Sequence, residues 1–360
     1  MIALEFQDHS LSRASQPDEV FNGPSKERRY LLSKLKHLVD DEPVQGLLWA
    51  SLYVCDISRL RAIIWKVNAE RPMEYLGHLD VSTTTLLLKW VQDFATKAEE
   101  YSNDGSSTAS YHTASQEQAC VVEVEDLVRK RDGRRCVLTG ATVYEVANIL
   151  PESVVSEITE PASDSDAPDF WTLLGYFFDP DRVQGWLEEM LQDPSDPNKV
   201  TDGCHNRICL DQTAHDLWRE GAFSLRPLAA SEDAKELTVQ FHWHPKQSHT
   251  AFDAVDLLNV PVSSRDSSSC SEAVLYTVPD ELRPDGVYRA KTGDVFVLKT
   301  ENPITHPLPI HALLDLHWCL SRMMTMSGID TVKEGKNGGE ESGEESSQGS
   351  SDGSSGEGSG

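Results

Sequence analysis

The sequence predicts an α+β protein in which helices come first, short strands follow and a last helix closes the chain. Residues 25–101 place apolar side chains at helical spacing, which indicates an all-helical N-terminal module. Residues 237–243 instead alternate apolar and polar side chains, which is the period of a β-strand. Because 360 residues are many for one compact core, we expect more than one domain, with flexible ends.

The helical module at 25–101 is preceded by residues 1–24, which we interpret as a flexible arm. A second helix is expected to begin at residues 40–43. Another, capped near Ser82, is expected at 86–101, because its apolar residues recur on one side of a helix.

Residues 102–118 are rich in Ser and Thr and are predicted to form a linker to the second part of the chain. A helix is expected at 121–131, and a basic cluster surrounds its end. The cluster consists of Arg129, Lys130, Arg131, Arg134 and Arg135. It suits a patch that contacts phosphates, and it equally suits a solvated helix end, where the macrodipole favours cations. Position along the chain does not decide between these interpretations.

The stretch after this helix has the pattern of a hairpin followed by a helix. Short strands are expected at 136–138 and 144–150, each ended by a turn residue or proline. Beyond a long insert, the apolar residues 208–210 lead into a helix for which Asp211 is a suitable N-cap and in which His215 lies one turn from the start. A hairpin packed on a helix, with polar residues on the facing surfaces, is typical of a small one-metal site.

The same stretch resembles the HNH nuclease domain, the ββα-metal or His-Me finger fold, in the version found in fungal HNH-domain proteins. That version has the pattern Cys-x-x-Thr-Gly, Val-Ala-His-Ile-x-Pro, His-Asn-x-x-x-Leu and Ala-His-Asp-x-Trp-x-x-Gly-x-Phe. This chain reads CVLTG at 136–140, VANILP at 146–151, HNRICL at 205–210 and AHDLWREGAF at 214–223. The nuclease-like domain implied by this resemblance spans residues 119–328.

The resemblance implies hydrolysis of DNA phosphodiesters with a divalent metal, Mg²⁺ or Mn²⁺, as cofactor. It places the general base at Asn148, the brace of the loop at Asn206 and a metal ligand at His215. The family has a His where this chain has Asn148, and an amide cannot take a proton from water. General-base catalysis contributes ~10²–10⁴-fold, so turnover is expected to be reduced. The alternative is a catalytically degenerate domain that binds protein or nucleic acid. His205, next to the motif, is another candidate for the base.

Further ligands are suggested by spacing. Glu145 and Ala147 lie on one face of a strand and Asn148 on the other, so Glu145 could supply a carboxylate to the metal that His215 binds, although a surface Glu explains this position equally well. Arg219 shares the helix face of His215 and suits a phosphate; with Arg131, Arg134 and Arg135 it forms our predicted substrate-binding set. Zinc is the alternative metal, with Cys136, Cys204, His205 and Cys209 as ligands, although they lack paired Cys-x-x-Cys spacing.

The insert at 152–200 contains two short amphipathic helices rich in aromatic residues. Such stripes usually form local core, here expected to cover the hairpin. The aromatic residues could also form a surface for a protein partner, as could the N-terminal helices, or stack on bases.

A β-rich extension is expected at 235–300, with a hairpin turn at 291–294, and a closing helix at 309–326. His242 and His244 are expected on the solvated face of a strand, where a metal site is the less common interpretation. Residues 329–360 form an acidic Gly/Ser tail and are predicted to be disordered.

Composition limits the partners and the compartment. The formal net charge of −27 opposes non-specific attraction to nucleic acid. The seven cysteines lack a disulfide-like spacing, which fits a reducing environment. No apolar run is long enough for a membrane span, and the N-terminus lacks the features of a signal peptide. We therefore expect an intracellular protein, nuclear or cytoplasmic.

Overall fold

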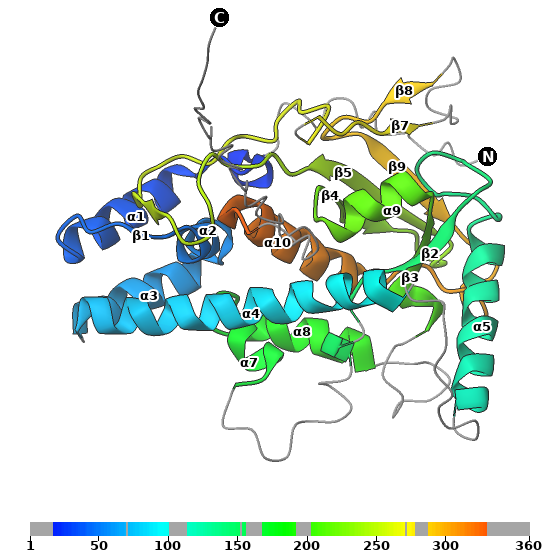
Figure 1. The fold of residues 1–360 in the computed structure, drawn as a ribbon, viewed down its shortest axis with the longest axis horizontal. Coiled ribbons are helices and arrows are strands. Elements are labelled where there is room, and N and C mark those ends of the chain that lie inside the picture. The colour runs from blue at the N-terminus through cyan, green and yellow to red at the C-terminus, as the bar shows by residue number, and fades with distance from the viewer. Residues whose placement is uncertain are drawn as a thin grey trace, which may run out of the picture.

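The computed structural model describes residues 17–69, 71–100, 114–151, 153–155, 168–191, 203–270, 272–277 and 287–329. The predicted α+β class is confirmed: helices combine with small antiparallel sheets (Figure 1). Most of the predicted linker and the acidic tail from residue 330 lie outside the described residues. No helix in the described ranges is both long enough and apolar enough to cross a membrane.

The chain begins with helices whose ends follow local signals. Helix α1 (Lys26–Leu38) starts at Ser25, whose hydroxyl accepts a hydrogen bond from the backbone N of Arg28 at 3.1 Å. Helices α2 (Gly46–Val54) and α3 (Ile57–Ala69) follow, and α2 is buried along its whole length.

The expected helix start at residues 40–43 is wrong. Asp40 and Asp41 have φ of 53° and 64°, so the chain turns through the left-handed region before α2. A two-residue strand, β1 (Val44–Gln45), then comes first and pairs with β6 (Ala254–Val255).

Helix α4 (Pro72–Glu100) is a single long helix, so the predicted cap near Ser82 is also wrong. Pro72 stands at its first position, where the missing N–H costs nothing. The Ser82 hydroxyl donates to the His78 carbonyl 2.9 Å away, one turn earlier in the helix. Bonding of this kind lets a Ser sit inside a helix instead of capping one.

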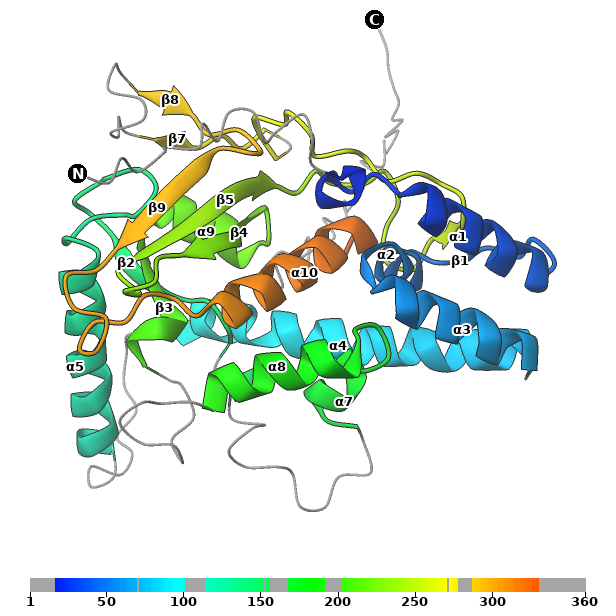
Figure 2. The same cartoon turned by 180° about the vertical axis from the view of Figure 1, so that it is seen from behind.

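The insert forms α7 (Phe170–Leu174) and α8 (Pro180–Leu191), which confirms the two predicted helices. Their aromatic side chains Phe170, Trp171 and Trp186 are buried. The expected place of packing is wrong, however, because α7 packs on α4, and α8 packs on the closing helix α10 (His311–Ser327) (Figure 2). These aromatics belong to the core.

The largest sheet is antiparallel, with the order β4 (Phe223–Ala230), β5 (Glu236–Trp243) and β9 (Val295–Lys299). Helix α10, the predicted closing helix, packs against β4 and against α2, between the sheet and the N-terminal helices (Figure 2). The prediction that one face of β5 is solvated is wrong, because Gln240, His242 and His244 are buried.

His242 near the end of β5 and His244 just after it are buried, because neighbouring elements cover this end of the sheet. His242 and His244 are 1% and 2% exposed. The ring of His242 lies 6.1 Å from the Trp318 ring of α10 and hydrogen-bonds to Gln240 at 2.9 Å. His244 hydrogen-bonds to Ser224 at 2.7 Å.

The predicted hairpin across residues 291–294 is only a turn. Asp294 accepts a hydrogen bond from the backbone N of Lys291 at 2.8 Å. The flanking strands do not pair with each other: β8 (Tyr288–Arg289) pairs with β7 (Tyr276–Thr277), whereas β9 pairs with β5.

One continuous cluster of buried apolar side chains extends from Val20 to Met326. It includes residues of α1–α4, the insert, the main sheet and α10. The two parts of the chain that we predicted, the helical module and the nuclease-like domain, therefore share one hydrophobic core. The predicted arm at 1–24 is described only from residue 17. In that part Phe21 is 1% exposed and belongs to the core, so residues near it pack against the rest of the fold.

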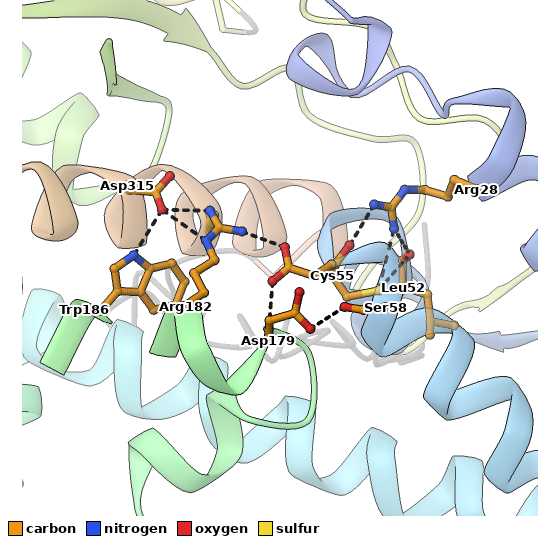
Figure 3. A network of polar contacts seen from close by, with 10 residues as sticks. Arg28, Leu52, Cys55, Ser58, Asp179, Arg182, Trp186 and Asp315 are labelled. Carbon is orange, nitrogen blue, oxygen red and sulfur yellow. Dashed lines mark hydrogen bonds and ion pairs between the residues drawn. The ribbon is translucent and has the colours of Figure 1, made fainter. Parts of the chain in front are cut away.

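Polar contacts also join the N-terminal helices to the rest of the fold (Figure 3). Arg28 of α1 donates to the carbonyls of Leu52 and Cys55 at 2.8 and 2.7 Å, which satisfies the C-terminal end of α2. Arg182 of α8 forms ion pairs with Asp56 at 2.7 Å and with Asp315 of α10 at 2.8 Å.

Candidate functional site

A small two-stranded sheet and the helix after it carry most of the predicted site residues. Strand β2 (Glu145–Asn148) pairs antiparallel with β3 (Arg207–Leu210), from Glu145 opposite Leu210 to Asn148 opposite Arg207. Helix α9 (Gln212–Arg219) follows β3 directly. Its predicted N-cap is confirmed, because the Asp211 carboxylate accepts a hydrogen bond from Ala214 N at 3.0 Å.

The expected strand at 136–138 is wrong. These residues form a turn that is closed by a 2.9 Å hydrogen bond from Gly140 N to the Cys136 carbonyl. Val137 N donates to the Cys209 carbonyl, so the turn lies beside β3 without extending the sheet as a strand. The two paired strands thus come from either side of the insert.

The two faces of the β2–β3 pair meet different helices. Ala147 and Ile208 belong to the main core, which also contains Ala214 and Trp218 of α9. On the opposite face, Val146 and Cys209 pack against Val128 of α5 (Ala114–Arg131). The alternation of side chains along β2 therefore separates Glu145 and Ala147 from Asn148.

Glu145 and His215 lie together at the α9 side of the strand pair. A carboxylate oxygen of Glu145 is 2.5 Å from Nδ1 of His215. The Glu145 side chain is 56% exposed and that of His215 is 19% exposed, so solvent and solutes reach the pair. The expected juxtaposition of these two side chains is present.

Asn148 lies at the other end of β2, about 10 Å along the strand from Glu145 by the rise of three residues. Its side-chain oxygen accepts a hydrogen bond from Nε of Arg207 at 3.1 Å. Its backbone carbonyl accepts from the indole N–H of Trp218 at 3.1 Å, which ties α9 to this end of the strand. The Asn148 side chain is therefore held by the guanidinium of Arg207.

Asn206 holds the chain that leaves β2. Its side-chain oxygen accepts from the backbone N of Leu150 at 2.8 Å, and its amide nitrogen donates to the Leu150 carbonyl at 3.1 Å. Its own carbonyl accepts from Ile149 N at 2.8 Å. This buried amide fixes the position of Asn148 through the backbone, as its predicted role of a brace requires.

The alternative zinc ligands do not gather around one point. Among the described residues, no group of three or more His, Cys, Asp or Glu side chains is placed to hold a metal ion. Cys204 and Cys209 pack with Val128 of α5 in a small apolar cluster, and Cys136 packs in the main core. Burial raises the pKa of Cys136, Cys204 and Cys209, which favours inert thiols. His205, the other candidate base, is 8% exposed within the short helix η3 (Cys204–Asn206).

The basic cluster divides into buried and exposed members. The Arg131 side chain is fully buried and forms an ion pair with Asp132 at 2.7 Å. It donates to the carbonyls of Cys204 and Arg207 at 2.7 and 2.6 Å. The predicted substrate-binding role of Arg131 is therefore corrected: the guanidinium is an internal brace and cannot reach a phosphate outside.

Other members of the predicted substrate-binding set lie at the surface. Arg134 and Arg135 are exposed in the turn after α5, and Arg219 is partly exposed at the end of α9. Arg129 forms intrahelical ion pairs with Glu125 and Asp126, as the interpretation of a solvated helix end predicts.

The sequence reasoning did not single out Arg207 and Asp132. Arg207 contacts Asn148, and the Asp132 carboxylate accepts from Cys209 N at 2.8 Å while it pairs with Arg131. The signal for Arg207 was its position directly after Asn206 in the motif. Asp132 carried no such signal, because Cys209, whose backbone N it accepts from, is distant in the chain.

Comparison with family models, with curated proteins and with solved structures found no match for this chain.

Proposed function

We propose that this chain is an HNH-like protein whose β2–β3–α9 unit binds a divalent cation and acts on DNA phosphodiesters by metal-dependent hydrolysis. The observation that carries the proposal is the pair formed by Glu145 and His215, 2.5 Å apart between the strand pair and the helix. The motif resemblance predicts a metal ligand at His215, and strand alternation left Glu145 as a candidate carboxylate on the face opposite to Asn148.

The donor set suits a small oxygen-preferring cation. One carboxylate and one imidazole are few protein ligands, and Mg²⁺ usually retains several of its waters. Glu145 and His215 would hold such an ion, which would polarise a phosphate oxygen and stabilise the leaving oxygen. Exposure of the Glu145 carboxylate leaves room for those waters and for a substrate.

The chain has Asn148 where the resemblance expects a general-base His. Asn148 orients groups through its amide, but an amide does not accept a proton from water at neutral pH. Loss of a general base lowers rates by ~10²–10⁴-fold, so we expect slow hydrolysis by the natural chain.

A second function is favoured by one contact, the hydrogen bond from Arg207 to Asn148. With its oxygen held by a guanidinium, Asn148 acts as part of the framework rather than as a group that faces water. The same fold would then be a catalytically degenerate module that binds nucleic acid or protein without cutting.

The decisive test is nicking of supercoiled plasmid with Mg²⁺ or Mn²⁺ by the parent, Asn148→His, His215→Ala and Glu145→Gln. Glu232→Gln changes an exposed carboxylate outside the unit and serves as the matched control. We expect slow nicking by the parent, loss with His215→Ala or Glu145→Gln, and a gain of roughly 10²-fold or more with Asn148→His. Mn²⁺ binding, followed by electron paramagnetic resonance, should weaken in the same two loss variants.

If Asn148→His nicks DNA and the parent does not, the natural chain is the degenerate module, and its scaffold is intact. Folded protein that neither binds Mn²⁺ nor nicks DNA in any variant would reject the nuclease proposal.

A further inference from the structure

The indole of Trp218 fastens α9 to the strand that carries Glu145. Trp218 lies three residues beyond His215 on α9 and is fully buried. Its indole N–H donates to the backbone carbonyl of Asn148 at 3.1 Å. Asn148 is the last residue of β2 and Glu145 is the first. This hydrogen bond and the contact between Glu145 and His215 therefore join α9 to both ends of the same strand.

The ring of Trp218 is held in turn by the closing helix. The imidazole of His317 on α10 stacks on it, with the ring centroids 3.7 Å apart and the planes at 10°. Trp90 of α4 makes an edge contact with His317 at 5.6 Å, and the ring of Phe223 lies 5.5 Å from Trp218. Close packing on these sides leaves the indole one orientation, so its hydrogen bond to β2 is fixed.

The contact between Glu145 and His215 is exposed and depends on its surroundings. The Glu145 side chain is 56% exposed and that of His215 is 19% exposed. Such a pair is held weakly, because both side chains lose rotamer freedom to form it and water competes for both partners. The separation of the two side chains is therefore set by the position of the α9 backbone relative to β2.

The same contact decides which nitrogen of His215 carries the proton. An ionised carboxylate only accepts hydrogen bonds, so Glu145 selects the form of the neutral ring with the proton on Nδ1. A hydrogen bond weakens steeply beyond about 3.2 Å, so a shift of α9 by about 1 Å is enough to release this selection.

We propose that Trp218 is a positioning residue, which holds His215 against Glu145 for the proposed cation site. The hydrogen bond to Asn148 and the stack on His317 fix α9 on β2, and α9 carries His215. The inference rests on the proposed function, because it concerns the same site. It adds that the site depends on α10, which lies outside the β2–β3–α9 unit.

The test uses the full chain with two variants and a matched control. Trp218→Phe keeps a ring and removes the indole N–H, whereas His317→Leu keeps apolar bulk on α10 and removes the stacked ring. The control is Trp49→Phe, because Trp49 of α2 is also fully buried and its indole N–H donates to the Asn259 carbonyl at 3.2 Å. Urea denaturation should show similar losses of stability in the two Trp→Phe variants.

Two readouts follow the site itself. The first is ¹⁵N NMR of the imidazoles in EDTA at alkaline pH, with the His215 signals assigned through His215→Ala. His215 should carry its proton on Nδ1 in the parent and in Trp49→Phe, and should be a mixture of tautomers in Trp218→Phe and His317→Leu. The second is Mn²⁺ binding by electron paramagnetic resonance, which should be roughly tenfold weaker in the same two variants and unchanged in the control.

The same His215 tautomer in all four proteins would overturn the inference. So would a mixture in the parent, because the contact with Glu145 would then be absent, or a change in Trp49→Phe as large as that in Trp218→Phe, which would assign the effect to lost stability. If Trp218→Phe does not fold, His317→Leu carries the same test.

The first readout contains no cation, so the two proposals fail separately. A tautomer that depends on Trp218, in a parent that does not bind Mn²⁺, rejects the cation site and keeps the positioning role. Mn²⁺ affinity and a His215 tautomer that are the same in all four proteins reject the positioning role alone.

Discussion

At the scale of single residues, Arg131 shows how a charged side chain can belong to the framework. Its guanidinium is enclosed by three backbone carbonyls and the Asp132 carboxylate, and it joins α5 to η3, β3 and the segment before α10. Each of these carbonyls is left without this donor if the side chain is removed, and Asp132, whose side chain is 5% exposed, loses its ion-pair partner.

We therefore expect Arg131→Ala to lower the free energy of unfolding by about 3–5 kcal/mol, the cost of leaving one member of a buried ion pair. Urea denaturation followed by circular dichroism measures this. Arg134→Ala is the matched control: Arg134 is exposed, and a surface substitution changes stability by about 0.5 kcal/mol or less. Similar stability of the two variants would contradict the role of Arg131 as a brace.

At the scale of elements, the ion pairs of Arg182 hold α8 between two other segments. The guanidinium contacts Asp56, which precedes α3, and Asp315 on α10. The indole of Trp186 also donates to Asp315 at 3.1 Å, and Asp179 N donates to Asp56 at 2.8 Å. These contacts join the insert to the N-terminal helices and to the closing helix (Figure 3).

Arg182→Ala should cost about 2–3 kcal/mol of unfolding free energy, less than a fully buried pair because the side chain is 29% exposed. The control is Arg61→Ala, which removes an exposed ion pair with Glu27 and should cost less than about 1 kcal/mol. A double-mutant cycle with Asp315→Ala measures the coupling. Additive losses in that cycle would show that the Arg182–Asp315 contact does not stabilise the fold.

At the scale of the whole molecule, buried histidines make stability depend on pH. His317 of α10 is 1% exposed, and its ring stacks on Trp218 of α9 with centroids 3.7 Å apart. Burial lowers its pKa from 6.5 to about 3. Burial, and then the charges of His242, Arg322 and His317, also lowers the pKa of His244.

A histidine with a depressed pKa binds its proton more readily in the unfolded chain, so folding is favoured at high pH and weakened as pH falls. For His317 the loss begins near pH 6.5 and continues to about pH 3, at about 1.4 kcal/mol for each pH unit.

His317→Phe retains an aromatic ring on Trp218 and removes this titration. Between pH 7.5 and pH 5, the variant should lose about 2 kcal/mol less unfolding free energy than the parent, as measured by urea denaturation at both values. An equal loss in both proteins would show that His317 is not the source of the pH dependence.

Local signals in the sequence were sufficient for features that depend on neighbouring residues. The cap at Asp211, the two insert helices and the closing helix follow from side chains within a few residues of each other, which meet by helical geometry alone. The expected pairing of Glu145 with His215 combined strand alternation with the motif resemblance.

Only the tertiary structure decided which surfaces are buried and which distant segments pair. It joined β2 to β3 across the insert, turned Arg131 inward, buried His242 under its neighbours and packed the insert on α4 and α10. Each outcome depends on atoms far away in the chain, because burial and hydrogen bonding are satisfied by whichever partner folding brings near. A window of sequence contains the period of a strand or helix, but it does not contain the element that will cover it.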